Sequence, residues 1–246
     1  MKNTKTYSKF TKILGIKVNS NQKNELLEEI SLKLKSKSKF TIFTPNPEII
    51  LEACNDLKLK EILNKSDFNL PDGNGLKIAD PKLEIIKGRE FMLDLFKLGN
   101  DKKLKIYLLG STKDVNTKSL NKIKKEFPNI KAKGESNISV TKGNINLPFD
   151  ILKNINLFKP DILFVALGAP KQEYLINKYR NEINAKCFMA IGGSLDYFSG
   201  QVRQVPDFFT KFSLEWLWRL IQEPKRAGRI FNAVIVFPLK VILSDS

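Results

Sequence analysis

The chain alternates between short apolar runs and longer stretches with helical periodicity, and this alternation restricts its fold more than any other feature. The runs expected to form strands lie at residues 40–44, 67–70, 104–109, 161–167 and 185–191, after a short opening strand around residues 13–18. Helical patterns lie between them, at residues 22–35, 47–55 and 170–179, with a further helix ending at residue 127. This alternation predicts an α/β, Rossmann-like fold, in which a mostly parallel sheet carries helices on both faces.

The character of the sequence changes near residue 206. Aromatic and basic helical segments follow, at residues 208–223 and from residue 224 onward, without a further strand pattern. We therefore predict an α/β domain at residues 1–205 and a C-terminal helical, membrane-associating appendage at residues 206–246. Residues 134–147, rich in Asn, Ser, Thr and Gly, are expected to form a loop.

The appendage combines an apolar stretch with cations. Lys225, Arg226 and Arg229 share helical spacing beside the apolar residues 230–243. No run reaches the roughly 18–20 apolar residues of a spanning helix. We therefore expect a soluble or peripheral protein whose appendage lies on an anionic membrane surface.

The absence of histidine excludes many mechanisms. Ser-His-Asp and Cys-His nucleophile systems and the usual zinc sites all need an imidazole. A general base must then be a carboxylate or, less readily, Lys, Tyr or Cys. The sequence also lacks an Asp-x-Asp pair, with which many sugar-transferring enzymes hold a divalent metal. We expect a metal-free site without a cofactor.

The net charge of +16 indicates an anionic partner, which could be nucleic acid, nucleotide phosphates or an acidic membrane. The aromatic residues lie mostly in apolar patterns, without a recognition helix or RNA-stacking signature, so a nucleic-acid-binding module is the weaker alternative. A Rossmann-type oxidoreductase is a second alternative, disfavoured because the chain has no G-x-G-x-x-G fingerprint. The two cysteines, Cys54 and Cys187, lie in apolar patterns and fit a reducing compartment.

Two polar clusters follow the first predicted strands of the sheet. Thr44-Pro45-Asn46-Pro47-Glu48 is held extended by its prolines beside a helix N-terminus, although alone it would be an ordinary Asn cap. Pro71-Asp72-Gly73-Asn74-Gly75 is typical of a turn, and such a rigid turn could present Asp72 as a carboxylate base. The nearby Arg89 could bind phosphate, or form a surface salt bridge.

Two further clusters follow later strands. In Gly168-Ala169-Pro170-Lys171-Gln172-Glu173, Gly168 permits close backbone approach, while Lys171 and Gln172 begin a helix whose dipole favours a diphosphate. Gly192-Gly193-Ser194-Leu195-Asp196 repeats this arrangement and adds a carboxylate for a base or ribose. Gly110-Ser111-Thr112 is a weaker candidate of the same kind.

Together with Glu215-Trp216-Leu217-Trp218-Arg219-Leu220 and Glu223-Pro224-Lys225-Arg226, these clusters resemble in their order the WecG/TagA/CpsF glycosyltransferase family, over about residues 40–230. The resemblance implies metal-independent, inverting transfer from a UDP-sugar, typically of N-acetylmannosamine or its uronic acid, to N-acetylglucosamine on undecaprenyl diphosphate. Such enzymes build cell-surface polysaccharide or teichoic acid, and the implied location is cytoplasmic, at the inner face of the membrane. The oligomeric state, including a homo-oligomer, stays open.

The resemblance also implies roles for individual residues. Asp72 would be the general base, Thr44 and Asn46 would line the sugar pocket, and Arg89 and Gln172 would contact the donor or its phosphates. Gly168, Lys171, Gly192, Gly193 and Asp196 belong to the donor-binding loops, with Asp196 toward the nucleoside. Arg219, Arg226 and Arg229 belong to a tail that approaches both site and membrane.

The sequence departs from the family pattern at two positions. Leu195 stands where Phe is usual, and Gln204-Val205-Pro206 stands where Arg-Ala-Pro is frequent. These departures leave the sugar specificity open.

Overall fold

The computed structural model describes residues 9–36, 38–203, 205–206, 208–209, 215–222, 224 and 227–244. Its centre is a six-stranded sheet in the order β4-β3-β8-β7-β5-β6, in which every neighbouring pair is parallel. The strands are β3 (Phe40–Phe43), β4 (Phe68–Asn69), β5 (Lys105–Gly110), β6 (Lys131–Glu135), β7 (Ile162–Ala166) and β8 (Cys187–Ala190). The predicted α/β class with a parallel sheet is confirmed.

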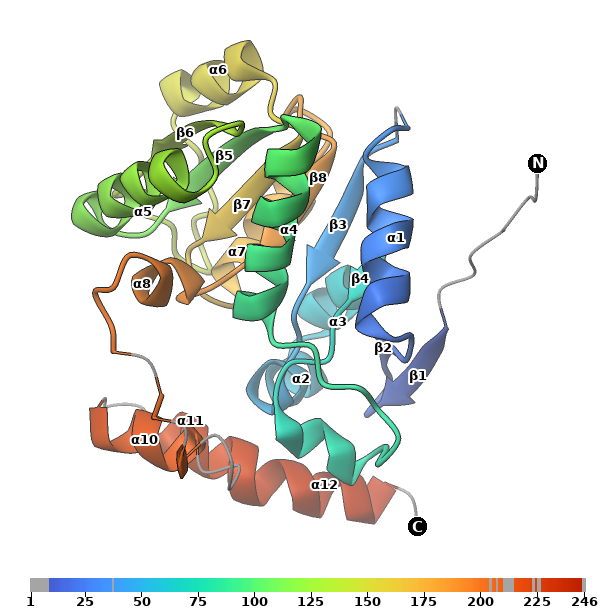
Figure 1. Ribbon diagram of the computed structural model, residues 1–246. Helices are drawn as coiled ribbons and strands as arrows, with labels where there is room; N and C mark the ends of the chain where they lie inside the picture. The colour runs from blue at the N-terminus through green and yellow to red at the C-terminus, as the bar shows by residue number, and fades with distance from the viewer. Residues whose placement is uncertain are drawn as a thin grey trace.

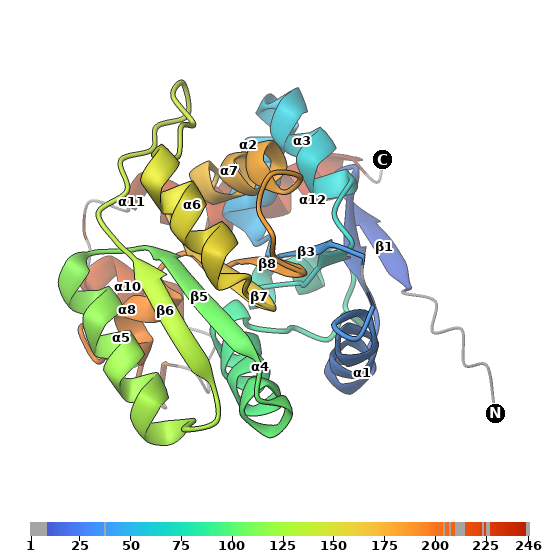
Figure 2. The same cartoon turned by 90° about the horizontal axis from the view of Figure 1, so that it is seen from above.

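Helices cover both faces of the sheet, as Figures 1 and 2 show. One face carries α1 (Lys23–Lys33), α4 (Gly88–Lys102), α5 (Lys113–Glu126) and α8 (Ser194–Phe198). The other carries α2 (Pro47–Asn55), α3 (Leu57–Asn64), α6 (Phe149–Phe158) and α7 (Lys171–Tyr179).

Side chains alternate between these two layers along each strand. In β7, Ile162 and Phe164 pack toward α4, whereas Leu163 and Val165 pack toward α7, and all four are fully buried. The central strands are therefore apolar throughout, as expected for strands buried on both faces.

The opening segment differs from the single strand predicted there. It is a hairpin of β1 (Phe10–Ile13) and β2 (Ile16–Asn19), paired antiparallel. Leu14 and Gly15 form the two-residue turn with φ of 48° and 80°. Both central residues thus adopt the left-handed conformation that favours such tight hairpins, and the chain reverses where one strand was predicted.

The loop predicted from residue 134 also begins differently. Gly134 and Glu135 complete the edge strand β6, which pairs with β5 alone. Its sequence KAKGE does not alternate between apolar and polar residues. As an edge strand, β6 is hydrogen-bonded on one side only, and its lysines face solvent. Beyond it, the loop carries an isolated antiparallel bridge between Thr141 and Asn144.

The described C-terminal part is helical, as predicted. It comprises α10 (Glu215–Gln222), α11 (Ala227–Phe231), the π-helical turn η3 (Asn232–Val236) and α12 (Phe237–Ser244). The helices α11, η3 and α12 run on without a break, and η3 and α12 pack against α2 and the 3₁₀ helix η1 (Asn74–Ile78). In Figure 1 they lie below the sheet, across the end toward which its strands run.

One face of this C-terminal helix joins the domain core, through the buried Ile230, Phe237 and Val241. The 18 residues Ala227–Ser244 are long and apolar enough to cross a membrane by length and composition alone. Only 17% of this segment is buried inside the protein. The sequence prediction that no segment reaches spanning length is wrong for this helix, because its residues on both sides of the apolar stretch continue the same helix. The division of the chain at residue 206 stays a prediction.

Candidate active site

The four predicted clusters meet at one edge of the sheet. Their strands β4, β3, β8 and β7 are consecutive neighbours, and all run in the same direction. The register brings the strand ends level, since Phe43 pairs with Asn69 and Val165 pairs with Ala190. The loop after β5 joins the same edge, where Ser111 N–H donates to the Ala166 carbonyl at 2.9 Å. Ligands of open α/β sheets bind at this carboxyl edge.

The loop after β3 enters α2 as predicted. The Asn46 side chain accepts a hydrogen bond from Ile49 N–H at 2.9 Å, and Pro47 occupies the first turn. Asn46 is therefore the helix cap, which fixes its side chain at the edge of the sheet. Thr44 is 9% exposed and lies against the start of α4, where a Cβ added to Gly88 would lie 2.9 Å from its Cγ2 atom. The close approach of Thr44 thus requires glycine beside Arg89.

The turn that carries Asp72 is fixed to that loop. Asp72 N–H donates to the Pro45 carbonyl at 3.1 Å, and Ile86 N–H donates to the Pro71 carbonyl at 2.8 Å. Gly73 has φ of 103°, which a side chain would disfavour, and a Cβ added to Gly75 would lie 2.9 Å from Pro47 Cγ. These contacts hold the partly exposed Asp72 next to the Thr44–Asn46 segment.

Arg89, in the first turn of α4, contacts α8, the helix that follows β8 on the same face of the sheet. Its guanidinium carbon lies 4.9 Å from the centroid of the Tyr197 ring, in a cation–π contact between α4 and α8. Tyr197 directly follows Asp196 in α8. Sequence reasoning missed Tyr197, because the contact joins residues more than 100 positions apart and no local pattern marks it.

Gln172, in the first turn of the helix that follows β7, is not exposed for contact with a donor. Gln172 is 2% exposed, and both ends of its amide are bonded within the protein: Nε2 donates to Glu173 Oε1 at 3.0 Å and Oε1 accepts from Gly192 N–H at 2.9 Å. Gln172 thus links the loops after β7 and β8. Lys171 is partly exposed at the start of α7.

The glycines of these two loops leave open space beside them. Gly168 and Gly192 have φ of 74° and 50°, and an added Cβ at either would meet nothing within 4 Å. At Gly193 it would lie 3.2 Å from Asp196 Oδ2. Backbone can therefore approach a ligand closely at Gly168 and Gly192.

The C-terminal arginines are only partly described. Arg229 is exposed on α11. The backbone of Arg219 lies in α10, whereas its side chain, together with Lys225, Arg226 and Gln204, falls outside the described residues. Their predicted roles stay predictions.

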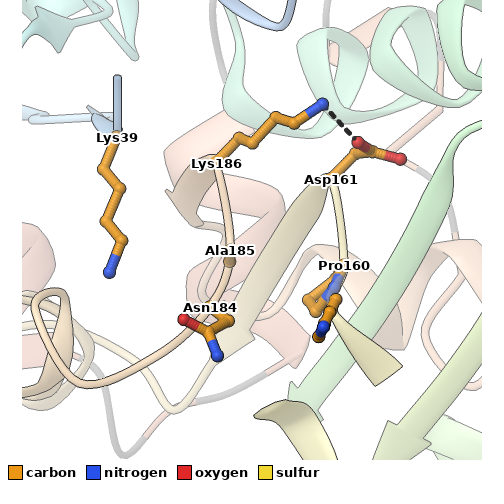
Figure 3. A pocket seen from close by; sticks show the side chains of 7 residues that line it. Lys39, Pro160, Asp161, Asn184, Ala185 and Lys186 are labelled. Carbon is orange, nitrogen blue, oxygen red and sulfur yellow. Dashed lines mark ion pairs between the residues drawn. The ribbon is translucent and has the colours of Figure 1, made fainter. Parts of the chain in front are cut away.

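A cavity of about 360 Å³ lies elsewhere, at the amino ends of the strands (Figure 3). Lys186 Nζ forms an ion pair with Asp161 at 2.9 Å there, and Lys39 Nζ donates to the Arg180 and Asn181 carbonyls at 3.0 Å. Burial and the Arg180 charge lower the pKa of Lys39. These groups join strand and loop ends, at the edge opposite to the candidate site.

The chain matches the Glycosyl transferase WecG/TagA/CpsF family over residues 11–245. It belongs to this family. The predicted resemblance is thereby confirmed, over a longer stretch than the motifs alone cover.

Individual relatives of this glycosyltransferase carry a common name, N-acetylglucosaminyldiphosphoundecaprenol N-acetyl-beta-D-mannosaminyltransferase. The protein of Bacillus subtilis (strain 168) is 37% identical over 196 residues, which cover 78% of this chain and 75% of the relative. That of Bacillus spizizenii is 35% identical over 196 residues, covering 78% and 74%. That of Staphylococcus aureus (strain MRSA252) is 30% identical over 237 residues, covering 93% and 91%.

A glycosyltransferase needs a base for the acceptor and positive charge for the leaving group. Asp72 is a carboxylate at the carboxyl edge of the sheet, in the loop after the outermost strand β4, and its backbone is bonded to Pro45 in the Thr44–Asn46 segment. Among the described residues no group of three or more Cys, Asp or Glu side chains is placed to hold a metal ion. Positive charge is available from Arg89, Lys171 and the N-terminus of α7.

Proposed function

We propose that this protein transfers N-acetylmannosamine from a UDP-sugar to the N-acetylglucosamine of undecaprenyl-diphosphate-linked acceptor. Membership of the family and the shared name of the relatives support the sugar and the acceptor. The observation that carries the proposal is the position of Asp72 at the carboxyl edge, tied by its backbone to the Thr44–Asn46 segment. The product would be a precursor of cell-surface polysaccharide or teichoic acid.

The chemistry follows from the groups at this edge. Asp72 accepts the proton of the acceptor hydroxyl, whose oxygen attacks the anomeric carbon of the donor sugar from the face opposite to UDP. The bond between that carbon and the diphosphate oxygen breaks, UDP leaves, and the anomeric configuration inverts. The negative charge that develops on the diphosphate is met by Arg89, by Lys171 and by the positive end of the α7 dipole, without a divalent metal.

The donor diphosphate would lie between the loops after β7 and β8. Gly168 and Gly192 leave room for phosphate oxygens close to the backbone, and Asp196 would accept hydrogen bonds from the nucleoside. The cationic appendage residues Arg219, Arg226 and Arg229 would add charge near the acceptor diphosphate.

The C-terminal helix suits a peripheral position on an anionic membrane. Its face away from the domain exposes Phe231, Ile235 and Leu239 to 57%, 44% and 55%, beside Arg229 and Lys240. Such a helix lies in the interface with its apolar side chains among the lipids and its cations near the headgroups. The protein would then work at the cytoplasmic face of the membrane.

Turnover of a panel of UDP-sugars with a lipid-linked N-acetylglucosamine acceptor tests the function. We expect UDP-N-acetylmannosamine to be used, and the rate to survive a chelator. Rates that vanish with chelator and return with a divalent cation would contradict the metal-free mechanism. Transfer from none of the UDP-sugars would contradict the function.

A further inference from the structure

Two adjacent polar side chains at the start of α7 are buried more deeply than ligand contacts would require. Gln172 is 2% exposed and Glu173 is 1% exposed. Glu173 is closed off from solvent, and a carboxyl group in the core costs free energy unless it is hydrogen-bonded. Its hydrogen bonds indicate what it positions.

The amide of Gln172 has a direction that its two partners determine. Nε2 donates to Glu173 Oε1 at 3.0 Å, while Oε1 accepts the Gly192 N–H at 2.9 Å. Turning the amide by 180° would set its NH₂ group against the Gly192 N–H, so both would be donors. It would also set the amide oxygen against Glu173 Oε1. An acceptor at Glu173 therefore favours the orientation that holds Gly192.

Gly192 opens the loop that leads to Asp196 and to Tyr197, on whose ring Arg89 lies. Its φ of 50° lies in the left-handed region, outside the range of a β-strand. The hydrogen bond from Gln172 therefore fixes the first residue of this donor-binding loop.

We propose that Glu173 is a positioning residue for donor binding, which orients the Gln172 amide and through it the Gly192 backbone. This proposal rests on the proposed function only in taking UDP as the ligand of the loop.

The protonation of Glu173 gives the proposal a measurable signature. Burial raises the pKa of its carboxyl to about 7, opposed by hydrogen bonds from Gln172 and from its own backbone N–H, and assisted by the charge of Glu52 on α2. On α3, Asp56 accepts from the Tyr174 hydroxyl and Lys58 lies over the Tyr174 ring. Oε2 of Glu173 has no hydrogen-bond partner among the described residues.

A pKa of about 7 would leave Glu173 mostly a neutral acid at pH 6 and mostly a buried anion at pH 8.5. The negative charge of this anion, next to Gln172 at the start of α7, would repel the donor diphosphate. UDP affinity should therefore fall as the pH rises through 7, beyond the change caused by ionisation of UDP itself.

Calorimetric titration of UDP at pH 6 and pH 8.5 tests the proposal on three variants. Glu173→Gln keeps an acceptor oxygen and cannot ionise, so its Kd at pH 6 should stay within about twofold of wild type and its affinity loss at pH 8.5 should be smaller by about tenfold, one pKa unit of coupling. Glu173→Met keeps the size without the acceptor or the charge, so it should weaken UDP about tenfold relative to wild type at pH 6 and lack the loss at pH 8.5 that the Glu173 anion causes. Glu182→Gln, the same change at an exposed site, should follow wild type.

The results separate the two proposals. Wild-type protein that does not bind UDP would overturn the proposed donor, and with it this role. If wild type binds UDP, an unchanged affinity of Glu173→Met at pH 6 would overturn the Glu173 role alone. A wild-type pH dependence retained in Glu173→Gln would do the same. Melting temperatures identify a Glu173→Met protein that fails to fold, in which case the pH dependence of Glu173→Gln decides.

Discussion

At the scale of single residues, Asp72 has two possible tasks, since its turn needs a polar residue and the reaction needs a base. Asp72→Asn keeps the size and most of the hydrogen bonding of the turn but cannot accept the acceptor proton. We expect turnover to fall by about 10²–10⁴, while UDP affinity and melting temperature stay near wild type. The measurement is steady-state transfer, with calorimetry and thermal unfolding on the same preparation.

Near-normal turnover of Asp72→Asn would defeat the base assignment. A lowered melting temperature with unchanged chemistry in the folded fraction would mark Asp72 as a turn residue. Glu48 and Asp196 would then be the next carboxylates to test.

Tyr197 acts on the same site through Arg89. Its ring holds the guanidinium at 4.9 Å, a contact worth roughly 0.5–1 kcal/mol at a partly exposed site. Tyr197→Leu should raise KM for the donor by about two- to fivefold, because Arg89 is no longer held toward the loop. Tyr197→Phe keeps the ring and should restore the wild-type KM in the same kinetic assay. Equal KM values for the Leu and Phe variants would show that the ring does not position Arg89.

At the scale of elements, the C-terminal helix has one apolar face packed on the domain and another apolar face exposed to solvent. Replacing Ile235 and Leu239 together by Ser removes exposed apolar surface and leaves the buried Phe237 in place. Fully burying such a side chain contributes about 1.5–3 kcal/mol, and half-immersion less. We expect the double variant to bind anionic liposomes at least about tenfold more weakly, with unchanged melting temperature.

Co-sedimentation with liposomes of acidic and of neutral lipid measures this. Leu157→Ser is the matched control, because Leu157 is 70% exposed on α6, at the far end of the molecule from the C-terminal helix in Figure 1. Equal sedimentation of the double variant, the control and the wild type would count against membrane docking through this face.

The elements also show how far the sequence predicts the structure. Strands buried on both faces, such as β7 and β8, were predictable because their apolar runs are continuous. The edge strand β6 was not predictable in this way, because its alternating lysines are exposed to solvent and it lacks an apolar run. Helix α4 was also not predicted, although Phe91, Met92, Leu95 and Phe96 bury one face at helical spacing.

The candidate site divides in the same way. Asp72, Asn46 and Gly192 follow strands, so the sequence alone brings them to one edge once the sheet is predicted. The contact of Arg89 with Tyr197 depends on how α4 and α8 pack, and the raised pKa of Glu173 depends on its burial and on Glu52 of α2. Neither is encoded in local spacing.

At the scale of the whole molecule, the sheet edge and the C-terminal helix form one side. A Cβ added to Gly75 would lie 4.0 Å from the Ala233 carbonyl, so the helix adjoins the turn that carries Asp72. A helix resting on the membrane would therefore hold the base within reach of a diphosphate at the lipid surface. The net charge of +16 would act in the same direction on an anionic membrane.

The pH dependence of folding is a further whole-molecule property, set in part by Glu173. Its folded pKa of about 7 lies above the ordinary value of 4.5, so the folded protein binds more protons than the unfolded chain between these values. Its contribution to the free energy of unfolding is complete below pH 4.5 and is lost as the pH rises through 7. Each pKa unit of difference corresponds to about 1.4 kcal/mol.

Asp56 has the opposite sign and a separate window. Burial raises the pKa of its carboxyl, but hydrogen bonds from Lys142, Tyr174 and the Leu59 N–H outweigh it and lower the pKa to about 2. Its contribution is lost only as the pH falls from about 4 toward 2. Denaturant titrations between pH 4.5 and 8 therefore isolate Glu173 when wild type is compared with Glu173→Gln. We expect the difference in unfolding free energy between the two proteins to shift in favour of the variant as the pH rises across this range. A difference that stays constant would mean that Glu173 is ionised in the folded protein throughout, with a partner that compensates its charge.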